Sequence, residues 1–267
     1  FSTARATAVK VLKLGSSGVQ AERLQSGAVV AHDIAATKLQ AALGEDVEMR
    51  ARFLWPSAGM IPTVKKWLAE FEPDVLYMII PTFWFGYESV PLRLERRLGR
   101  LGKPLASTGL RAAGNPKLAH NAVFRAGRRL AHTLIGGDSH FTPGYVVGEI
   151  DKLLRTVLAG NEELLVVIHG PQGWNAYHSS NRANRRAEQR RLLVDARLRQ
   201  LCTELHIPYF GTALPLNERG IRIETTGDGL HAAEQSQEFL GVKDFRYLHE
   251  AISAHRAGSN RPAQTPS

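Results

Sequence analysis

Apolar runs typical of strands alternate along the chain with segments of helical periodicity. Short runs rich in aliphatic and β-branched residues predict strands at 8–14, 47–54, 75–81, 164–169 and, more briefly, 207–210. Apolar positions spaced three and four residues apart predict helices at 28–43, 60–71, 90–101, 117–134, 145–159, 182–205 and 232–253. Strands separated by helix-length segments need crossover connections, so the pattern predicts a parallel sheet of about five strands with helices on both faces.

The segments that directly follow the predicted strands carry the polar residues of interest. Open parallel sheets bind their ligands at the carboxyl ends of the strands. These segments contain Ser17, Gly59, Thr82 to Trp84, His169 to Asn175, and Asp228 to His231. We therefore expect the functional site at the carboxyl edge of the sheet.

Two segments stand outside the alternation of strands and helices. The stretch at about 102–144 is rich in glycine, basic residues and histidine, and a connection this long usually forms a lid or extends a binding site. The tail at 257–267 is polar and contains proline, so we expect it to be disordered. We predict that residues 1–256 form a single α/β domain, with 102–144 as a lid-like insertion.

The 267 residues carry a formal net charge of +9, which raises the question of an anionic partner. The arginines gather in 182–191 and 125–129, without interleaved aromatic residues and without zinc-finger spacing or an RNA-recognition signature. We interpret them as solvated helix faces and expect no nucleic-acid partner. The single cysteine, Cys202, rules out a disulfide framework and fits a buried structural role, and the histidine spacing predicts no metal.

No apolar run approaches the roughly 18 residues that a membrane span needs, and the N-terminal segment lacks the apolar core of a signal peptide. We therefore expect a cytoplasmic protein without a membrane span, although a signal removed ahead of residue 1 would leave no trace here. The oligomeric state is not indicated by the sequence.

A candidate nucleophile and its partners lie near opposite ends of the chain. Ser16 and Ser17 follow the first predicted strand between Gly15 and Gly18, which permit a sharp turn. A hydroxyl needs a neighbouring imidazole, usually with a carboxylate behind it, to act as a nucleophile. The stretch Thr226-Gly-Asp-Gly-Leu-His231 supplies both, so the two ends together predict a serine nucleophile assisted by Asp228 and His231.

These residues resemble the SGNH (GDSL-like) hydrolases. Leu14-Gly-Ser-Ser17 is similar to the first block of that family, whose last serine is the nucleophile, which favours Ser17 over Ser16. Asp228-Gly-Leu-His231 is similar to its final block, in which the histidine is the base and the aspartate orients it. The resemblance implies a flavodoxin-like three-layer sandwich and cofactor-free hydrolysis of a small acyl or acetyl ester through an acyl-enzyme.

The second and third sequence blocks of the family concern the oxyanion hole. The second family block donates a glycine backbone N–H, which the resemblance assigns to Gly59. The third block carries an asparagine, whereas this chain reads Pro81-Thr-Phe-Trp-Phe-Gly86. Losing one oxyanion donor costs about 2.7–4 kcal/mol of transition-state stabilisation. The Thr82 hydroxyl, the Trp84 indole N–H and the Asn175 amide are candidate replacements, and the sequence does not choose among them.

Other residues give competing interpretations. His32 with Asp33, and Asp138 with His140, are rival acid–base pairs, the first in a predicted helix and the second in the long insertion. His169 ends a predicted strand at the carboxyl edge, where it either lines the pocket or, as we favour, is a hydrogen-bonded structural residue.

Two further functions stay open at this point. The same triad serves an acyltransferase if an alcohol or sugar replaces water as the acceptor. Alternatively, Gly15-Ser-Ser-Gly18 forms a phosphate cradle, and the protein is a non-catalytic module for an anionic ligand such as a flavin phosphate. The aromatic residues Phe83, Trp84, Phe85 and Tyr87 form either core or an apolar acyl pocket.

Overall fold

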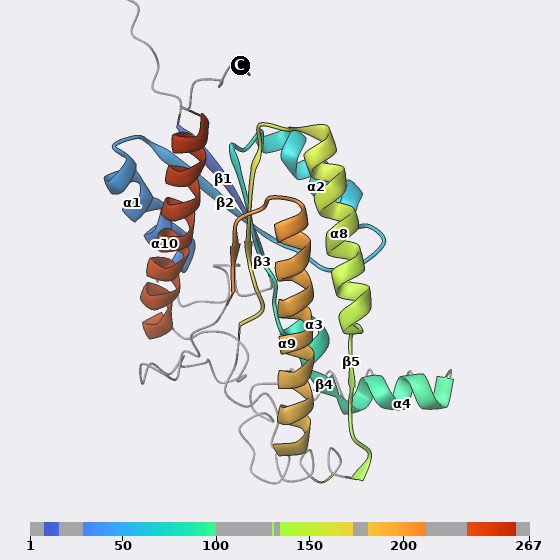
Figure 1. The fold of residues 1–267 in the computed structure, drawn as a ribbon. Coiled ribbons are helices and arrows are strands. Elements are labelled where there is room, and N and C mark those ends of the chain that lie inside the picture. The colour runs from blue at the N-terminus through green and yellow to red at the C-terminus, as the bar shows by residue number, and fades with distance from the viewer. Residues whose placement is uncertain are drawn as a thin grey trace, which may run out of the picture.

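Five parallel strands form the central sheet (Figure 1). A computed structural model describes residues 8–15, 29–99, 130, 134–172, 181–211 and 234–259 of the chain. The strands, in chain order, are β1 (Val9–Gly15), β2 (Val47–Phe53), β3 (Val75–Ile79), β6 (Leu165–His169) and β7 (Tyr209–Phe210). Their order across the sheet is β2-β1-β3-β6-β7, and each neighbouring pair is parallel.

This strand order creates a topological switch point between β1 and β3. The chain passes from β1 outward to β2 on one side and then returns to place β3 on the other side of β1. The same order is found in flavodoxin-like folds, which bind ligands outside the carboxyl ends of the strands at such a point. The fold therefore directs attention to the segments that follow β1 and β3.

Helices cover both faces of the sheet and complete a three-layer sandwich (Figure 1). One face carries α1 (Ala31–Leu43) and α10 (Glu234–Ser259). The other carries α2 (Met60–Phe71), α8 (Pro143–Gly160) and α9 (Asn181–Glu204). No helix within the described ranges is both long and apolar enough to span a lipid bilayer.

Local sequence explains several helix ends. Thr142 caps α8 because its hydroxyl accepts a hydrogen bond from the Tyr145 N–H (3.2 Å), and Pro143 suits the first helical position. This cap starts α8 two residues earlier than the predicted 145. At the end of α1, Gly44 adopts φ 70°, a left-handed conformation that glycine tolerates, and its N–H bonds the Gln40 carbonyl.

The two faces of the sheet have different cores. Along β1 the side chains alternate, so Leu12 and Leu14 pack with α2, α8 and α9, while Val9 and Val11 face α1 and α10. The first core is built from buried hydrophobic residues such as Leu153 and Cys202, and burial raises the pKa of this thiol to about 12. The expected structural role of the cysteine agrees with this environment.

The second core, beside α1 and α10, combines apolar contacts with buried charge. Gly241 brings α10 very close to α1, since a Cβ at this position would lie 2.7 Å from the Ala31 carbonyl oxygen. Leu248 and other apolar residues of α10 pack on the sheet, but Lys13 and Asp244 are buried among them. A buried lysine in β1, between β2 and β3, is the first departure from a plain apolar core.

Three short elements that periodicity did not predict lie on either side of residues 100–129 in the chain. They are α3 (Phe83–Gly86), β4 (Glu88–Ser89) and β5 (Asp138–Ser139). β4 and β5 pair antiparallel, with α4 (Val90–Leu98) between β4 and the insertion. Elements of two to four residues are too short to show a period of 2 or 3.6, which is why the pattern missed them.

Most predicted elements agree closely with the structure, and α2 has the predicted bounds 60–71. The predicted start of the disordered tail was too early, because α10 continues to Ser259. Arg256 holds this last turn through an ion pair with Glu45 (2.9 Å), and the first proline comes only at Pro262. The predicted helix at 117–134 falls almost entirely outside the described residues.

Candidate active site

The carboxyl ends of β1 and β3 lie side by side, with Leu14 paired to Met78. Four residues expected at this edge, Ser17, Asn175, Asp228 and His231, lie outside the described residues. The described segments next to them in the sequence are the end of β1 at Gly15 and the start of α10 at Glu234. The position of these two segments decides what the site can contain.

The start of α10 lies at the carboxyl edge, beside the start of α1. The Ala31 N–H donates a hydrogen bond to the Gln237 side-chain oxygen (3.1 Å). At the far end of α10, Arg256 pairs with Glu45, which immediately follows α1 at the amino edge of the sheet. α10 therefore runs antiparallel to the strands, and the described ends next to the expected triad residues, Gly15 and Glu234, both lie at the carboxyl edge.

Gly59 follows β2 at this edge and is the residue ahead of α2. Its carbonyl accepts hydrogen bonds from the Thr63 N–H (3.2 Å) and hydroxyl (2.7 Å). Its own N–H takes part in none of the hydrogen bonds found within the described part of the chain, and the residue is exposed. An exposed, unused backbone donor at a helix N-terminus is suited to an oxyanion.

Comparison with solved structures identifies the fold. The psychrotrophic esterase EstA from Pseudoalteromonas sp. superposes with a TM-score of 0.51 at 9% identity, over 93% of this chain and 99% of the esterase. TesA gives a TM-score of 0.52 at 13% identity, over 92% of this chain and 99% of TesA. These structures are SGNH/GDSL esterases. The chain has the SGNH hydrolase fold.

The aryl esterase of M. smegmatis also superposes, with a TM-score of 0.50 at 15% identity over 91% of this chain and 100% of the esterase. No protein-family model matches the sequence, and no curated protein matches it either. The likeness to the SGNH hydrolase fold is therefore visible in the backbone and not in overall sequence identity.

Two residues expected to replace the missing asparagine of the third block, Thr82 and Trp84, lie in the described structure, and only one of them has a free hydrogen-bond donor there. The Thr82 hydroxyl is buried and donates its one proton to the Gln172 carbonyl (2.5 Å), so in this structure that proton joins the segments after β3 and β6. The Trp84 indole is fully buried in the core beside α2, α8 and α9, and its N–H has no hydrogen-bond partner in the described structure. Trp84 thus keeps an unused donor, whereas Thr82 does not.

The aromatic residues after β3 divide between the two roles expected for them. Trp84 and Phe85 are fully buried in the core. Phe83 and Tyr87 are only half-buried, and their rings stack 5.0 Å apart. Three further rings contact this pair or each other, so that an aromatic surface, here called the edge aromatic cluster, is formed by Trp55, Phe83, Tyr87, His140 and Phe141.

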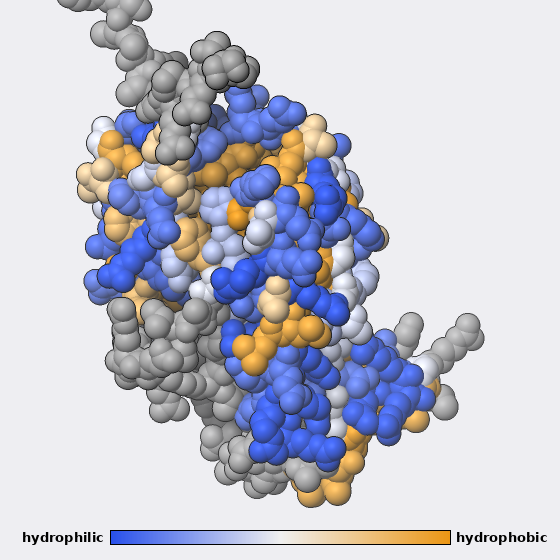
Figure 2. Space-filling view, viewed as in Figure 1, coloured by the Kyte–Doolittle hydropathy of each residue, from blue (hydrophilic) through white to orange (hydrophobic). Residues whose placement is uncertain are grey.

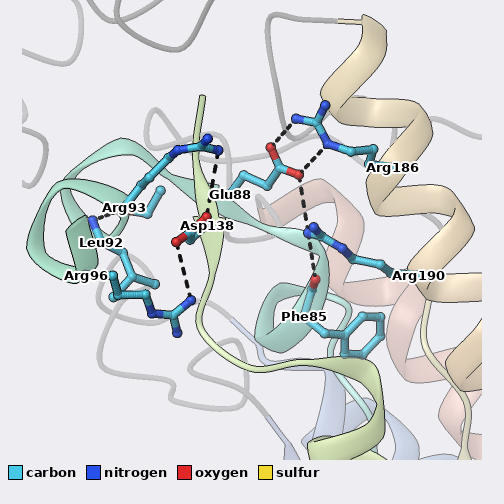
Figure 3. A network of polar contacts seen from close by, with 9 residues as sticks. Phe85, Glu88, Leu92, Arg93, Arg96, Asp138, Arg186 and Arg190 are labelled. Carbon is cyan, nitrogen blue, oxygen red and sulfur yellow. Dashed lines mark hydrogen bonds and ion pairs between the residues drawn. The ribbon is translucent and has the colours of Figure 1, made fainter. Parts of the chain in front are cut away.

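Neither rival acid–base pair has a catalytic arrangement. The His32 Nε2 lies 3.8 Å from the exposed Asp33 carboxylate, and burial followed by the charge of Lys13 lowers the pKa of His32. The Asp138 carboxylate faces Arg93 and Arg96 instead of the His140 ring (Figure 3). Arg96 in turn donates to the His140 carbonyl (3.0 Å), so these residues fasten α4 to β5 and the residue that follows it.

The arginines of α9 are only partly the solvated face that we expected. Figure 3 shows Arg186 and Arg190 converging on Glu88, whose buried carboxylate lies 2.6 Å and 3.3 Å from them. Arg182 and Arg185 are exposed, in line with the hydrophilic surface over this part of α9 (Figure 2). Two of the five arginines in 182–191 therefore fasten β4 to α9.

His169 is a structural residue in this fold, as we favoured. It ends β6, is fully buried, and its Nδ1 lies 3.1 Å from the Tyr77 hydroxyl. Burial, followed by the charges of Lys243 and Lys13, holds the pKa of His169 well below its usual value, so the ring is neutral at pH 7.

Sequence reasoning missed the partners of this histidine. Tyr77 donates to Asp244 (2.7 Å), which also accepts from Lys13 (2.6 Å), so four buried polar side chains form one network. The run 9–14 contains two lysines, Lys10 and Lys13, and a lysine within such a strand was the available signal, because an unpaired lysine is almost never fully buried. Its partner is 231 positions away along the chain, and no local pattern points to it.

Proposed function

We propose that this protein is a serine hydrolase of the SGNH type that cleaves a carboxylic ester, with Ser17 as nucleophile, His231 as base and Asp228 as the residue that orients it. The observation that carries the proposal is that α10 begins beside the start of α1 at the carboxyl edge, where β1 also ends, as marked by the hydrogen bond from Ala31 to Gln237 (3.1 Å). The sequence blocks that resemble the SGNH family flank these same two ends.

Sequence distance supports the assignment. Ser17 is two residues beyond Gly15, the end of β1, and His231 is three residues ahead of Glu234, the start of α10. An extended chain spans at most about 3.3–3.6 Å per residue. The Cα atoms of Ser17 and His231 are therefore tethered within about 7 and 11 Å, respectively, of backbone that lies at the carboxyl edge.

The proposed reaction has two steps. His231 takes the Ser17 hydroxyl proton while the oxygen attacks the ester carbonyl carbon, and Asp228 stabilises the imidazolium that results. The tetrahedral intermediate collapses, His231 gives its proton to the departing alkoxide, and an acyl-enzyme remains. Water, deprotonated by His231, then attacks the acyl carbon. The bond between this carbon and the Ser17 Oγ breaks, the carboxylic acid leaves, and His231 returns its proton to the Ser17 Oγ.

The oxyanion of both intermediates is proposed to rest on the backbone N–H groups of Ser17 and Gly59. The unused Gly59 donor supports its part in this hole. Among the candidates for a third donor, the Trp84 indole N–H is unpartnered in the described structure, the Thr82 hydroxyl is already engaged, and Asn175 remains a proposal from sequence.

The edge aromatic cluster supports an apolar or aryl ester as the substrate. Trp55 follows β2, Phe83 follows β3, and both keep part of their ring exposed at the carboxyl edge. Large half-exposed rings bind apolar groups well. The structural neighbours named above are described as an esterase and an aryl esterase, which is compatible with this class.

A panel of p-nitrophenyl esters from acetate to decanoate tests the function. We expect turnover by the wild type, a loss of about 10⁴-fold or more in kcat for Ser17→Ala and His231→Ala, and little change for the matched control Ser16→Ala. Turnover that survives in Ser17→Ala would contradict the assignment. Acyl transfer to an added alcohol in preference to water would turn the proposal into an acyltransferase.

A matched pair of substitutions tests the proposed substrate class. Phe83→Leu removes a half-exposed ring, so we expect a higher KM for aryl and long-chain esters with nearly unchanged stability. Phe85→Leu removes a buried ring two residues away, so it should lower stability and leave the KM ratio between esters unchanged. Equal KM effects of the two substitutions would argue against the cluster as a binding surface.

A further inference from the structure

A network of buried polar side chains joins the first strand of the sheet to the last helix. Lys13 on β1 donates to the Asp244 Oδ2 on α10 (2.6 Å), and the Tyr77 hydroxyl on β3 donates to the Asp244 Oδ1 (2.7 Å). Lys13, Tyr77 and Asp244 are each at most 3% exposed. Both carboxylate oxygens of Asp244 are thus bound to neighbouring strands at the centre of the sheet.

The directions of the hydrogen bonds extend this network to β6. Tyr77 has one hydroxyl proton, and Asp244 receives it, so the contact between the Tyr77 oxygen and the His169 Nδ1 (3.1 Å) needs the proton on the histidine. The neutral His169 ring therefore carries its proton on Nδ1 and donates to Tyr77. One carboxylate on α10 is connected in this way to β1, β3 and β6.

Stability alone does not account for a charge pair in this place. Taking a lysine and an aspartate out of water is costly, and two apolar side chains of similar size usually stabilise a core equally well or better. A better-attested role for buried polar groups is to select one arrangement of packed elements over others that are nearly as compact.

The apolar contacts of α10 with the sheet do not select one arrangement as sharply. Leu248, Ala251 and Ile252 pack on the sheet through apolar surface, and this attraction is not directional. Asp244 differs because two short hydrogen bonds of fixed direction are satisfied together at one rotation and one height of the helix. Sliding or turning α10 would leave a buried charge without its partner.

We propose that Lys13, Tyr77 and Asp244 are positioning residues, whose network fixes α10 against β1 and thereby sets His231 opposite Ser17. This inference rests on the proposed function, because its consequence is read at the triad. Lys13 is four residues ahead of Ser17 on the chain, and Asp244 is ten residues inside a helix that begins three residues after His231. A helix transmits a shift along such a length as a rigid body of about 15 Å.

The test replaces both charges together. The double variant Lys13→Met/Asp244→Leu keeps the volume of the core and leaves neither charge unpaired, and Tyr77 can then donate to the His169 Nδ1 once the ring changes tautomer. We expect a thermal midpoint at or above that of the wild type, a kcat at least about tenfold lower, and a KM within about twofold, since small misplacements of catalytic groups slow the chemical step.

A second link between α10 and the rest of the chain provides the control. Arg256 of α10 also forms an ion pair (2.9 Å) with Glu45, which follows α1. This pair lies at the opposite edge of the sheet, and both side chains are about 40% exposed. Glu45→Gln/Arg256→Met should leave kcat within about twofold of the wild type. A folded Lys13→Met/Asp244→Leu protein with wild-type kcat would overturn the proposal, as would a kcat that falls only in proportion to the folded fraction.

A separate readout distinguishes failure of this inference from failure of the proposed function. Amide hydrogen exchange in residues 234–241 of α10 requires no substrate. Loss of protection there in the buried-pair variant, with the rest of the sheet unchanged, supports the positioning role even if the wild type cleaves no ester. Unchanged protection overturns it, whatever the activity of the wild type.

Discussion

The two faces of the central sheet are built on different principles. Beside α2, α8 and α9, aliphatic and aromatic side chains such as Leu14, Ile150 and Leu153 fill the core. Beside α1 and α10, apolar packing surrounds the network of Lys13 and Asp244. Close apolar packing supplies stability and tolerates conservative exchange, whereas the network admits one placement of the helix. The helix on this polar face, α10, begins three residues after the proposed catalytic base His231.

The largest effect should follow from breaking the network on one side only. Asp244→Ala leaves the Lys13 ammonium buried and unpaired, so we expect it to lower the free energy of unfolding by about 4 kcal/mol. Urea denaturation measures this loss. A loss under about 1 kcal/mol would mean that Lys13 finds another partner or reaches water, and that the faces differ less than described.

On the apolar face, Leu153→Ala removes a fully buried side chain of α8 and leaves a cavity. We expect a loss of about 3 kcal/mol in the free energy of unfolding, with kcat of the folded enzyme unchanged. The comparison with the double variant of Lys13 and Asp244 is the informative part, because that variant should show the reverse pattern. A large fall in kcat for Leu153→Ala at full folding would remove the contrast between the faces.

A lysine next to the network should destabilise the polar face. The Lys243 ammonium nitrogen is buried without a hydrogen-bond partner in the described structure, and burial lowers its pKa to about 8. At pH 7 the lysine is still mostly charged, and burying this charge costs stability relative to the unfolded chain, so Lys243→Met should raise the free energy of unfolding by about 2 kcal/mol. The exposed Lys152 on α8 is the control, and Lys152→Met should change stability by less than about 0.5 kcal/mol.

The same pKa gives a pH dependence with a defined sign. Between about pH 8 and pH 10.5 the unfolded chain binds the Lys243 proton more fully than the folded protein does. The stability of the wild type should therefore rise with pH across this window relative to Lys243→Met, as measured by urea denaturation at each pH. If the free energies of unfolding of the two proteins change equally with pH, the Lys243 ammonium is solvated.

The smallest expected effect concerns His169. Its pKa in the folded protein lies well below 6.5, mainly because of burial, so the unfolded chain takes up a proton that the folded protein does not. The contribution of the neutral His169 ring to the free energy of unfolding should be fully present above about pH 6.5. Relative to His169→Gln, the free energy of unfolding should fall by about 1 kcal/mol between pH 6.5 and 5.5. If the difference between wild type and variant does not change over this range, His169 is accessible to protons.

Local sequence predicted the architecture well because the governing patterns are local. The periodicity of 60–71 and the apolar run at 75–81 are visible within a dozen residues, and their alternation requires a parallel sheet. The two-residue β4 and β5 were missed, because their pairing joins Glu88 to Ser139 across the insertion. Phe83 and Phe85 look alike in sequence, and only the turn of α3 places one at the surface and the other in the core.

The candidate site was predicted in part for a similar reason. Gly59 follows from its place after β2, and the structure adds that its N–H is unused within the described residues. The engagement of the Thr82 hydroxyl by the Gln172 carbonyl depends on the spacing of β3 and β6, which sequence does not reveal. The Lys13–Asp244 pair depends on the whole fold, since it joins positions 231 residues apart.

The most direct measurement of the central claim is covalent labelling with a fluorophosphonate, followed by peptide mass spectrometry. One structural neighbour, EstA, is described as inhibited by monoethylphosphonate, which makes this reagent class a natural choice. The account predicts one label per chain on Ser17, none on Ser17→Ala, and normal labelling of Ser16→Ala. A folded wild-type protein that takes up no label, or that carries it on a residue other than Ser17, would contradict the account.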